Sequence, residues 1–508
     1  MQVECQQLIE SLERLWPGVA ASWPAPAKGS LRLVLDSREL APGDVFVALP
    51  GVRADGRDHI AQALADGAAL VLCHHDDDDP AGAAIEDSRV LHLPGLKVLQ
   101  GELGRTLFGV PDDLEVIGVT GTNGKSSVTH YIAALSEAVE RPCGLVGTLG
   151  HGRPGQLIDS GLTTPGPLAL QAQLADMAAD GVSRVAMEVS SHALDQQRLE
   201  GCRVHAGVFT NLSRDHLDYH ASMAAYAAAK AQLFKRAELE LAVVNGDDPL
   251  ARLMLAGIAP RVRVLATGQD EATTLRVLDW EPHEAGQRAL VASPEGEFSL
   301  ALGLMGRFNL DNVLLAMAVL YGLGESLEAL SVAAERLAPV PGRMQLLARP
   351  GLPSVVVDYA HTPDALDNAL QALRAHLDVR EGRARGRLWC LFGCGGERDT
   401  GKRPLMAQVA EARAECVVIT DDNPRGEAPD SIRQQVMGGL SAEGRSAAWN
   451  IAGRAAAIER VIAEAGAEDV ILIAGKGHEA YQEIADVRHA FSDLAVAEAA
   501  LRQREHNP

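Results

Sequence analysis

The stretch VIGVTGTNGKSS, residues 116–127, decides the fold of the middle of this chain. An apolar run from Leu114 to Val119 predicts a buried parallel strand, and apolar residues at helical spacing after Lys125 predict a helix. In the loop between them, glycines let backbone N–H groups approach an anion, and the helix start attracts negative charge. We therefore expect the loop to cradle the phosphates of a nucleotide through Gly121, Thr122, Asn123, Gly124, Lys125, Ser126 and Ser127.

Two side chains of this loop have expected roles in phosphate chemistry. Lys125 would reach the terminal phosphates, and the hydroxyl of Ser126 would bind Mg²⁺. The general P-loop pattern has a glycine five residues before Gly124, where this chain has Val119. The alternative is an ordinary glycine turn, but the complete series of strand, loop and helix favours phosphate binding.

The composition excludes several classes of protein. A chain of 508 residues is expected to form three domains of ~150 residues each. The net charge of −22 argues against a nucleic-acid partner or an anionic membrane surface. The seven cysteines lack paired spacing, which is typical of a reducing compartment, and zinc is not expected. The sequence contains no signal-peptide pattern and no apolar run long enough to span a membrane, so we expect a soluble, cytoplasmic monomer.

Strands and helices alternate along the chain, which predicts an α/β fold with parallel sheets. We expect a first domain over residues 1–113, a central P-loop domain over 114–342, and a C-terminal doubly wound, Rossmann-like domain over 343–508. Hinges are expected near residues 113 and 340, the second in the proline-rich segment 337–344. Strands are expected at 31–35, 45–49, 69–73, 90–93, 114–119, 184–187, 206–209, 241–244, 354–357, 388–392, 416–420 and 470–474, with helices at 59–65 and 221–234.

Most of the strands expected after residue 113 end in polar residues. Ligands bind beyond the carboxyl ends of strands in open α/β sheets, so these residues are candidates for a site. Glu188 follows one central strand and would share Mg²⁺ with Ser126. His216 follows another strand, although a lone histidine is more often structural. Lys230 lies in an alanine-rich helix, where a lysine is usually exposed.

Short motifs along the whole chain resemble the Mur ligases. The loop GTNGKSS also resembles that of the folylpolyglutamate synthases, and both families are ATP-dependent and form amides. The late motifs DNPR (422–425) and GKGHE (475–479) are similar, more narrowly, to Mur ligases that add 2,6-diaminopimelate to UDP-N-acetylmuramoyl-L-alanyl-D-glutamate. Other motifs are DSR (36–38), DVFVAL (44–49), ADGRDHI (54–60), TTP (163–165), MEVSSHAL (187–194), DHLDYH (215–220), AYAAAKAQLF (225–234), GRFNLDN (306–312), PGRM (341–344), DYAHTPD (358–364) and GCGGERDTGKRPLM (393–406).

The resemblance implies a substrate for each domain. The residues implied to hold the UDP-sugar peptide are Leu35, Ser37, Val52, Arg53, Ala54, Thr163, Thr164, Ser190, Gln196 and Arg198. Those implied to close on ATP beside the loop are Asn309, Arg343, Asp358 and His361. Those implied to bind diaminopimelate are Arg398, Asp422, Asn423, Pro424, Arg425, Gly475 and Glu479. Leu162 departs from many relatives, which have Asn there, so that polar contact is in question.

The resemblance also implies the metal chemistry. Ser126, Glu188 and His216 would serve Mg²⁺, and Lys230 would be carbamylated and face a second Mg²⁺. The residues implied to be catalytic are Lys125, Glu188, His216 and Lys230. They would act on the γ-phosphoryl group as it is transferred to a carboxylate. An amine would then attack the acyl phosphate.

Three alternatives stay open. Lysine could replace diaminopimelate within the same family. A folylpolyglutamate-type ligase would share the glycine loop but gives no reason for the first domain or for DNPR. A P-loop switch or transport ATPase would not need a second ligand edge in residues 343–508.

Overall fold

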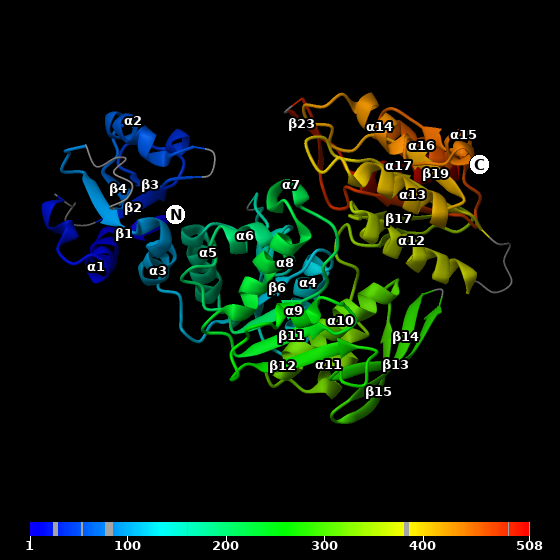
Figure 1. The fold of residues 1–508 in the computed structure, drawn as a ribbon, viewed down its shortest axis with the longest axis horizontal. Helices are drawn as coiled ribbons and strands as arrows, with labels where there is room; N and C mark the ends of the chain where they lie inside the picture. Colours follow the sequence, from blue (N-terminus) through cyan, green and yellow to red (C-terminus); the bar gives the residue numbers. More distant parts are fainter. Residues whose placement is uncertain are drawn as a thin grey trace. The chain divides into compact units, whose positions relative to one another are not determined.

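The structure is a computed structural model that describes residues 1–506 except 24–28, 52–53, 77–84, 160, 284, 380–385 and 486 (Figure 1). The chain forms two compact units. The first comprises Met1–Val116 and Pro142–Val204, and the second comprises Ile117–Arg141 and His205–Pro508. Each unit is described by itself.

The first unit begins with a five-stranded sheet of order β1-β2-β3-β4-β5. β1 is antiparallel to β2, and the other neighbours are parallel. Alternate strand residues pack against α1 and α3, because side chains on a strand point to opposite faces. The elements are β1 (Gln2–Glu4), α1 (Cys5–Leu15), η1 (Val19–Ser22), β2 (Ser30–Val34), η2 (Ser37–Glu39), β3 (Val45–Ala48), η3 (Gly56–His59), α2 (Ile60–Ala65), β4 (Leu70–His75), β5 (Val90–Pro94) and α3 (Leu96–Phe108).

The rest of the first unit is built around parallel strands β7 and β9, with β8 antiparallel to β7. α3 packs closely against this part. A Cβ at Gly101 would lie 1.7 Å from the carbonyl oxygen of Glu200, so only glycine allows the approach. The elements are β7 (Cys143–Gly147), β8 (Gly150–Gly152), α5 (Pro167–Ala179), β9 (Arg184–Glu188) and α6 (Ser191–Asp195).

The second unit contains strands in the order β15-β14-β13-β12-β11-β10-β6. Neighbours are parallel from β6 to β13, and β13, β14 and β15 form an antiparallel meander. α10 is apolar on almost every face and is buried. The elements are β6 (Glu115–Thr120), α4 (Lys125–Ala138), β10 (Ala206–Phe209), α7 (Leu217–His220), α8 (Met223–Ala231), η4 (Gln232–Lys235), β11 (Leu241–Asn245), α9 (Ala251–Met254), β12 (Arg263–Gly268), β13 (Leu275–His283), β14 (Gly286–Ser293), β15 (Gly296–Leu302), α10 (Arg307–Gly322) and α11 (Leu327–Ala334).

The second unit also holds a six-stranded sheet of order β16-β17-β21-β18-β19-β20, in which only β16 is antiparallel to its neighbour. Its two faces have separate cores. Val356 packs with α12, α13 and α14, whereas Val355 and Val357 pack with α16 and α17. Helices on both faces of a parallel sheet make this the expected doubly wound fold.

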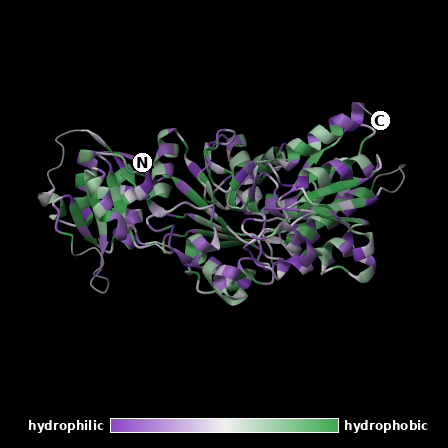
Figure 2. Ribbon diagram, turned by 90° about the horizontal axis from the view of Figure 1, so that it is seen from above, coloured by the Kyte–Doolittle hydropathy of each residue, from purple (hydrophilic) through white to green (hydrophobic). Residues whose placement is uncertain are grey.

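The elements of this part are β16 (Gln345–Leu347), β17 (Ser354–Asp358), α12 (Pro363–Asp378), β18 (Leu388–Phe392), α13 (Lys402–Arg413), β19 (Cys416–Ile419), α14 (Pro429–Met437), α15 (Ala442–Ala447), β20 (Trp449–Asn450), α16 (Arg454–Glu464), β21 (Val470–Ala474), β22 (Tyr481–Ile484), β23 (Val487–Ala490) and α17 (Asp493–His506). Hydrophobic colour concentrates on the strands, and the helices carry both colours (Figure 2).

The expected strands are present within about two residues at each end. The helix expected at 221–234 is divided into α8 and η4. The meander β13–β15 and the hairpin β22–β23 were not expected. Within the described residues, no helix is both long and apolar enough to cross a membrane.

Candidate active site

Three strands of the second unit end level with one another. Thr120 of β6 pairs with Phe209 of β10, and Phe209 pairs with Val244 of β11. The segments that follow these strands therefore meet at one edge. The backbone N–H of Asn123 donates to Oδ1 of Asn211 at 3.0 Å, which ties the glycine loop to the segment after β10.

The glycines of the loop are needed where they stand. Gly121 has φ +151°, and a Cβ there would lie 1.8 Å from Oγ1 of Thr210. Gly124 has φ +85° immediately before α4, and a Cβ there would lie 2.6 Å from Oδ1 of Asn312. Larger residues would push the loop away from its neighbours. The loop thus leads into α4 at Lys125, as the sequence predicted.

Two lysines converge on a single carbonyl of this loop. Nζ of Lys125 donates to the carbonyl oxygens of Gly121 and Thr122 at 2.9 and 2.8 Å. Nζ of Lys230 donates to the same Gly121 oxygen at 2.7 Å. Lys230 is only 1% exposed, so the usual exposed position of a helix lysine does not apply. Burial lowers the pKa of Lys230 well below its ordinary value, and the charge of Lys125 lowers it further.

Tyr226 supports this pair of lysines from α8. It is one turn before Lys230 and fully buried, and its ring centroid lies 4.5 Å from Nζ of Lys230. Its hydroxyl lies 3.1 Å from Oγ1 of Thr122 in the loop. Tyr226 therefore links the helix that carries Lys230 to the loop. Sequence reasoning does not select Tyr226, because an aromatic residue on a helix is usually a core residue.

Arg343 connects the linker before β16 to the glycine loop. Its Nη2 donates to Oγ of Ser126 at 3.1 Å, and its guanidinium lies 4.3 Å from the ring centroid of Tyr359. Its Nη1 also lies 3.4 Å from Nδ1 of His478 in the GKGHE segment. One side chain thus contacts both the expected nucleotide loop and the segment expected to bind the amine.

The other residues expected at ATP have different surroundings. Oδ1 of Asn309 accepts from the hydroxyl of Tyr131, so Asn309 packs against α4. Asp358 is buried and accepts from the backbone N–H groups of Met344 and Ala360, so it holds the linker. Burial raises the pKa of Asp358 despite these hydrogen bonds. No hydrogen bond between Asp358 and the glycine loop occurs in the described part of the chain.

His361 and His216 both face Asp215. Nε2 of His361 lies 3.7 Å from Oδ2 of Asp215, and Nε2 of His216 lies 3.4 Å from the same atom. Burial raises the pKa of Asp215, but the contact with His361 and nearby positive charges hold that pKa well below its usual range. Asp215 belongs to the polar cluster after β10, from which the sequence reasoning selected only His216.

Glu188 belongs to the first unit. It ends β9, is 1% exposed and accepts from the backbone N–H of Thr148 at 2.9 Å. Beside it, the residues expected at the sugar-peptide form one network. Arg198 donates to Oε1 of Gln196 and to the carbonyl oxygen of Thr164.

The remaining members of this network join through hydroxyls. Oγ1 of Thr164 accepts from the backbone N–H of Ser190 at 3.1 Å, and Ser190 caps α6. Oγ1 of Thr163 lies 3.0 Å from Oγ1 of Thr148. Leu162, next to them, is 50% exposed.

The residues expected to hold UDP lie in the first sheet. Leu35 follows β2, and the turn closed by Gly51 and Ala54 follows β3, which is parallel to β2. They share the carboxyl edge of the sheet, with Ser37 at the start of η2. Val52 and Arg53 lie outside the described residues.

The C-terminal sheet forms the expected second edge. Ala474 of β21 pairs with both Asp358 of β17 and Phe392 of β18, and Phe392 pairs with Ile419 of β19. The segments after these strands are therefore adjacent. The backbone N–H of Gly396 donates to the carbonyl oxygen of Asn423 at 2.9 Å. A Cβ at Gly475 would lie 2.7 Å from Oδ2 of Asp422.

Arg425 has a backbone conformation unusual for its residue type. Its φ is +51°, and it is held by two backbone hydrogen bonds to β22 and its turn, from its N–H to Glu483 and from Ala485 to its carbonyl. Its Nη1 donates to the carbonyl oxygen of Gly396 at 2.9 Å, and its Nε lies 3.2 Å from Oε2 of Glu483. The hairpin that the sequence did not predict therefore aims this side chain. Pro424 precedes it and accepts from Glu427, and Arg398 is exposed, with one bond to the Glu397 carbonyl.

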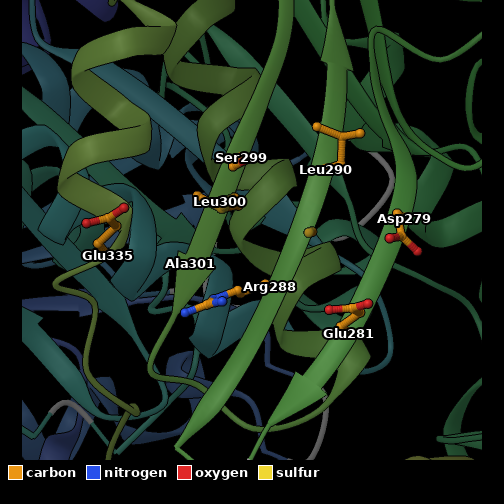
Figure 3. A pocket seen from close by; sticks show the side chains of 9 residues that line it. Asp279, Glu281, Arg288, Leu290, Ser299, Leu300, Ala301 and Glu335 are labelled. Carbon is orange, nitrogen blue, oxygen red and sulfur yellow. The ribbon is translucent and has the colours of Figure 1, made fainter.

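Among the described residues, no three His, Cys, Asp or Glu side chains are grouped as a metal site. A shallow pocket of about 370 Å³ lies on the meander, with Asp279, Glu281 and Arg288 on the strands and Glu335 just after α11 (Figure 3). No residue expected at a substrate lines it.

Three family models match successive parts of the chain. The Mur ligase family, catalytic domain, matches residues 32–103. The Mur ligase middle domain matches residues 119–320, and the Mur ligase, glutamate ligase domain, matches residues 342–477.

Curated relatives match nearly the whole chain. A protein of Pseudomonas syringae pv. tomato is 47% identical over 471 residues, which cover 92% of this chain and 94% of the relative. One of Xanthomonas campestris pv. campestris is 44% identical over 499 residues, which cover 97% and 98%. Both are named UDP-N-acetylmuramoyl-L-alanyl-D-glutamate--2,6-diaminopimelate ligase.

Solved structures agree in fold. A structure of a UDP-N-acetylmuramoyl-L-alanyl-D-glutamate--2,6-diaminopimelate ligase has a TM-score of 0.68 and 37% identity, covering 98% of this chain and 99% of the other. MurF ligase from Thermotoga maritima, solved in complex with ADP, has a TM-score of 0.65 at 20% identity, covering 93% and 98%. The second likeness shows the fold alone.

Proposed function

This chain belongs to the Mur ligase family, and from that premise we propose that it joins meso-2,6-diaminopimelate to the D-glutamate carboxylate of UDP-N-acetylmuramoyl-L-alanyl-D-glutamate with consumption of ATP. One observation carries the proposal. Arg343 contacts Ser126 of the glycine loop and His478 of the GKGHE segment. The loop lies at the edge proposed for ATP, here called the nucleotide edge, and the segment lies at the edge of the C-terminal sheet proposed for diaminopimelate, here called the amine edge. One side chain therefore joins the two edges. A nucleotide switch has no need of such a link.

The chemistry starts from an unreactive carboxylate, because an oxide is a poor leaving group. Transfer of the γ-phosphoryl group of ATP to the substrate carboxylate gives an acyl phosphate and ADP. The amine nitrogen then attacks the acyl carbon, phosphate leaves, and the nitrogen loses a proton. Lys125, which now donates to loop carbonyls, would turn to the phosphoryl oxygens and offset their charge.

The three side chains proposed for Mg²⁺ are each of a type that this ion can bind. A hydroxyl at Ser126 and a buried carboxylate at Glu188 are hard oxygen ligands, and His216 adds a nitrogen. Mg²⁺ usually keeps waters and substrate phosphates as its other ligands, so a group of three protein side chains is not required. When bound, the ion would supply positive charge to the phosphoryl group.

We propose that Lys230 is carbamylated. Its amine is buried, and burial together with the charge of Lys125 lowers its pKa, so the unprotonated form that reacts with CO₂ is favoured. A carbamate would place a negative charge beside the ammonium group of Lys125 and would provide oxygens suited to a hard cation.

Arg425 and Glu479 are the residues proposed to choose the amine. Diaminopimelate differs from lysine by a carboxylate at its far end, and arginine can bind a carboxylate through two parallel hydrogen bonds. Glu479 would pair with the ammonium group at that end, with Arg398 nearby.

The proposal places the enzyme in the cytoplasm as a monomer, and all seven cysteines are free thiols, as a reducing compartment requires.

The test is the substrate requirement for phosphate release. Purified protein with Mg²⁺ and ATP should release phosphate only when the UDP-sugar dipeptide and diaminopimelate are both present. Steady release with neither substrate would support an ATPase or switch. Release with a folate and glutamate, but not with the UDP-sugar dipeptide, would support a folylpolyglutamate-type ligase.

A further inference from the structure

Lys476 is a buried cation that the proposed chemistry does not use. It lies between Gly475 and Gly477 after β21 and is 0% exposed. A buried ammonium group is costly unless its charge and its three N–H donors are satisfied. The contacts that satisfy it therefore indicate what this lysine does.

Lys476 contacts three side chains of the C-terminal sheet's edge. Nζ donates to Oε2 of Glu479 at 2.7 Å and to Oδ1 of Asn423 at 2.9 Å. The ring centroid of Tyr481 lies 5.5 Å from Nζ, within the range of a cation–π contact. Two of these partners, Glu479 and Asn423, are residues expected to bind diaminopimelate.

Asn423 completes a closed set of hydrogen bonds. Its Nδ2 donates to Oε2 of Glu479 at 2.9 Å, and its Oδ1 also accepts from the backbone N–H of Glu483 at 3.0 Å. Oε2 of Glu479 thus receives two hydrogen bonds. In the described part of the chain, Oε1 of Glu479 receives none, so a single oxygen of this carboxylate is left for a ligand.

Charge balance at this edge points the same way. Asp422 is adjacent to Asn423, and although burial raises the pKa of Asp422, the charges of Arg454 and Lys476 lower it below its ordinary value. Lys476 therefore stabilises two carboxylates that face the same segment. Arg454 forms two hydrogen bonds with the carboxylate of Asp493, and in the described part of the chain Lys476 is the cation that forms an ion pair with Glu479.

We propose that Lys476 is a positioning residue for the amine substrate: it fixes Glu479 and Asn423 as one unit and leaves only Oε1 of Glu479 to receive the substrate's far ammonium group. The inference rests on the proposed function, since it assumes that Glu479 binds an amino acid. Lys476 itself would touch no substrate and would act through Glu479 and Asn423, which are proposed to bind the amine. Its loss should weaken binding of the amine and leave the nucleotide unaffected.

The experiment is a double-mutant cycle of Lys476→Met and Glu479→Gln, read as KM and kcat for each substrate. Lys476→Met keeps an unbranched side chain, one atom shorter, and removes the charge. We expect it to raise the KM for diaminopimelate about tenfold or more, with the KM for ATP changed by less than about twofold. In the Glu479→Gln background the same change should raise that KM by no more than about twofold, because its ionic partner is already gone.

The matched control is Arg184→Met. Arg184 is also a buried cation in an ion pair, with Glu115, but it belongs to the first unit, whereas Lys476 belongs to the second. The Arg184→Met substitution should not raise the KM for diaminopimelate more than the KM for ATP. If Lys476→Met alone precipitates, the double variant still decides, since it removes both charges and is compared with Glu479→Gln.

Equal rises in the KM for ATP and for diaminopimelate would overturn the inference, because they would indicate a general structural role. A full tenfold rise in the Glu479→Gln background would overturn it as well. The wild-type arm separates this failure from that of the proposed function. If wild type does not use diaminopimelate at all, the proposed function fails and the inference falls with it; if it does, only the variants decide.

Discussion

Two lysines share the carbonyl oxygen of Gly121, and their environments differ. Lys125 starts α4 and is partly exposed, whereas Lys230 is buried on α8. Two ammonium groups on one oxygen repel each other, so the more buried one loses its proton more readily. The pKa of Lys230 is lowered by burial first and by the charge of Lys125 second. Position alone thus gives two lysines different chemistry.

Replacing Lys125 by alanine should leave a folded protein that cannot form the acyl phosphate. The side chain is the mobile cation of the loop, and loss of one positioned charge in phosphoryl transfer commonly costs ~10²–10³ in rate. Phosphate release with all substrates measures the effect, and thermal unfolding checks the fold. Lys235→Ala, an exposed lysine of η4, is the control and should keep full activity. Near-normal release by Lys125→Ala would refute the assignment of the loop.

Lys230 should carry a carbamate in the active enzyme. Activity should fall when CO₂ is removed exhaustively and return with bicarbonate. Protein equilibrated with ¹³C-bicarbonate should show a carbamate carbon signal by NMR that Lys230→Met lacks and Lys235→Ala retains. A fully active, CO₂-free preparation without that signal would contradict the prediction.

At this scale the sequence identified residues whose role is set locally. Lys125 and Ser126 follow from the loop pattern, which is contiguous in the chain. Lys476 and Tyr226 could not be found in this way, because their burial depends on segments that are distant in sequence. A lysine between two glycines has the composition of an exposed turn, and only the packing of Tyr481, Asn423 and Glu479 around it shows otherwise.

Among the secondary-structure elements, parallel strands were predictable and antiparallel additions were not. β17, β18, β19 and β21 are short apolar runs followed by polar residues, which is typical of buried strands in a doubly wound sheet. The hairpin is half-buried along most of β22 and exposed along β23, and it has no apolar face to mark it. It nevertheless holds the backbone of Arg425, so part of the amine edge depends on an element without a sequence signal.

Asp469 fixes the starts of two strands of the C-terminal sheet. It precedes β21 and accepts from the backbone N–H groups of Arg387 and Gly466 and from the indole of Trp389. Burial raises the pKa of Asp469, but these hydrogen bonds and the charge of Arg387 outweigh it and hold the pKa below its ordinary 3.8. The carboxylate therefore contributes stability above pH 3.8, and this contribution is lost as the pH falls toward the lower, folded-state pKa.

Asp469→Asn should lower the free energy of unfolding by about 1–3 kcal/mol at pH 7, because an amide nitrogen would face backbone donors. The difference from wild type should shrink as the pH falls below about 4. Denaturant unfolding at several pH values measures both. Asp367→Asn, which removes an exposed ion pair with Arg413, should change stability little. A difference independent of pH would rule out the carboxylate as its cause.

Within the second unit as a whole, the linker and the amine edge are in close contact. A Cβ at Gly342 would lie 2.1 Å from the backbone nitrogen of His478, and the φ of Gly342 is +68°. The next residue, Arg343, reaches Ser126. A movement of the linker therefore affects both substrate edges, which fits the expectation of a hinge near residue 340.

Gly342→Ala should lower kcat about tenfold or more, because the linker must move away from His478 and take Arg343 with it. Gly351→Ala is the matched control. Gly351 has a similar φ of +76° but nothing within 4 Å of an added Cβ, so it shares the backbone strain without the clash. Equal loss of kcat in both variants would show that strain alone is responsible.

The choice of amine is the sharpest test of the proposed diaminopimelate-adding activity. The kcat/KM of the wild type should be measured with meso-diaminopimelate and with lysine, each as the only amine, at saturating ATP and UDP-sugar dipeptide. Lysine lacks the far carboxylate that Arg425 is proposed to bind, so we predict kcat/KM for diaminopimelate higher by on the order of 10³ or more. Arg425→Ala should lose most of this preference. Comparable kcat/KM values for the two amines in wild type would contradict the account.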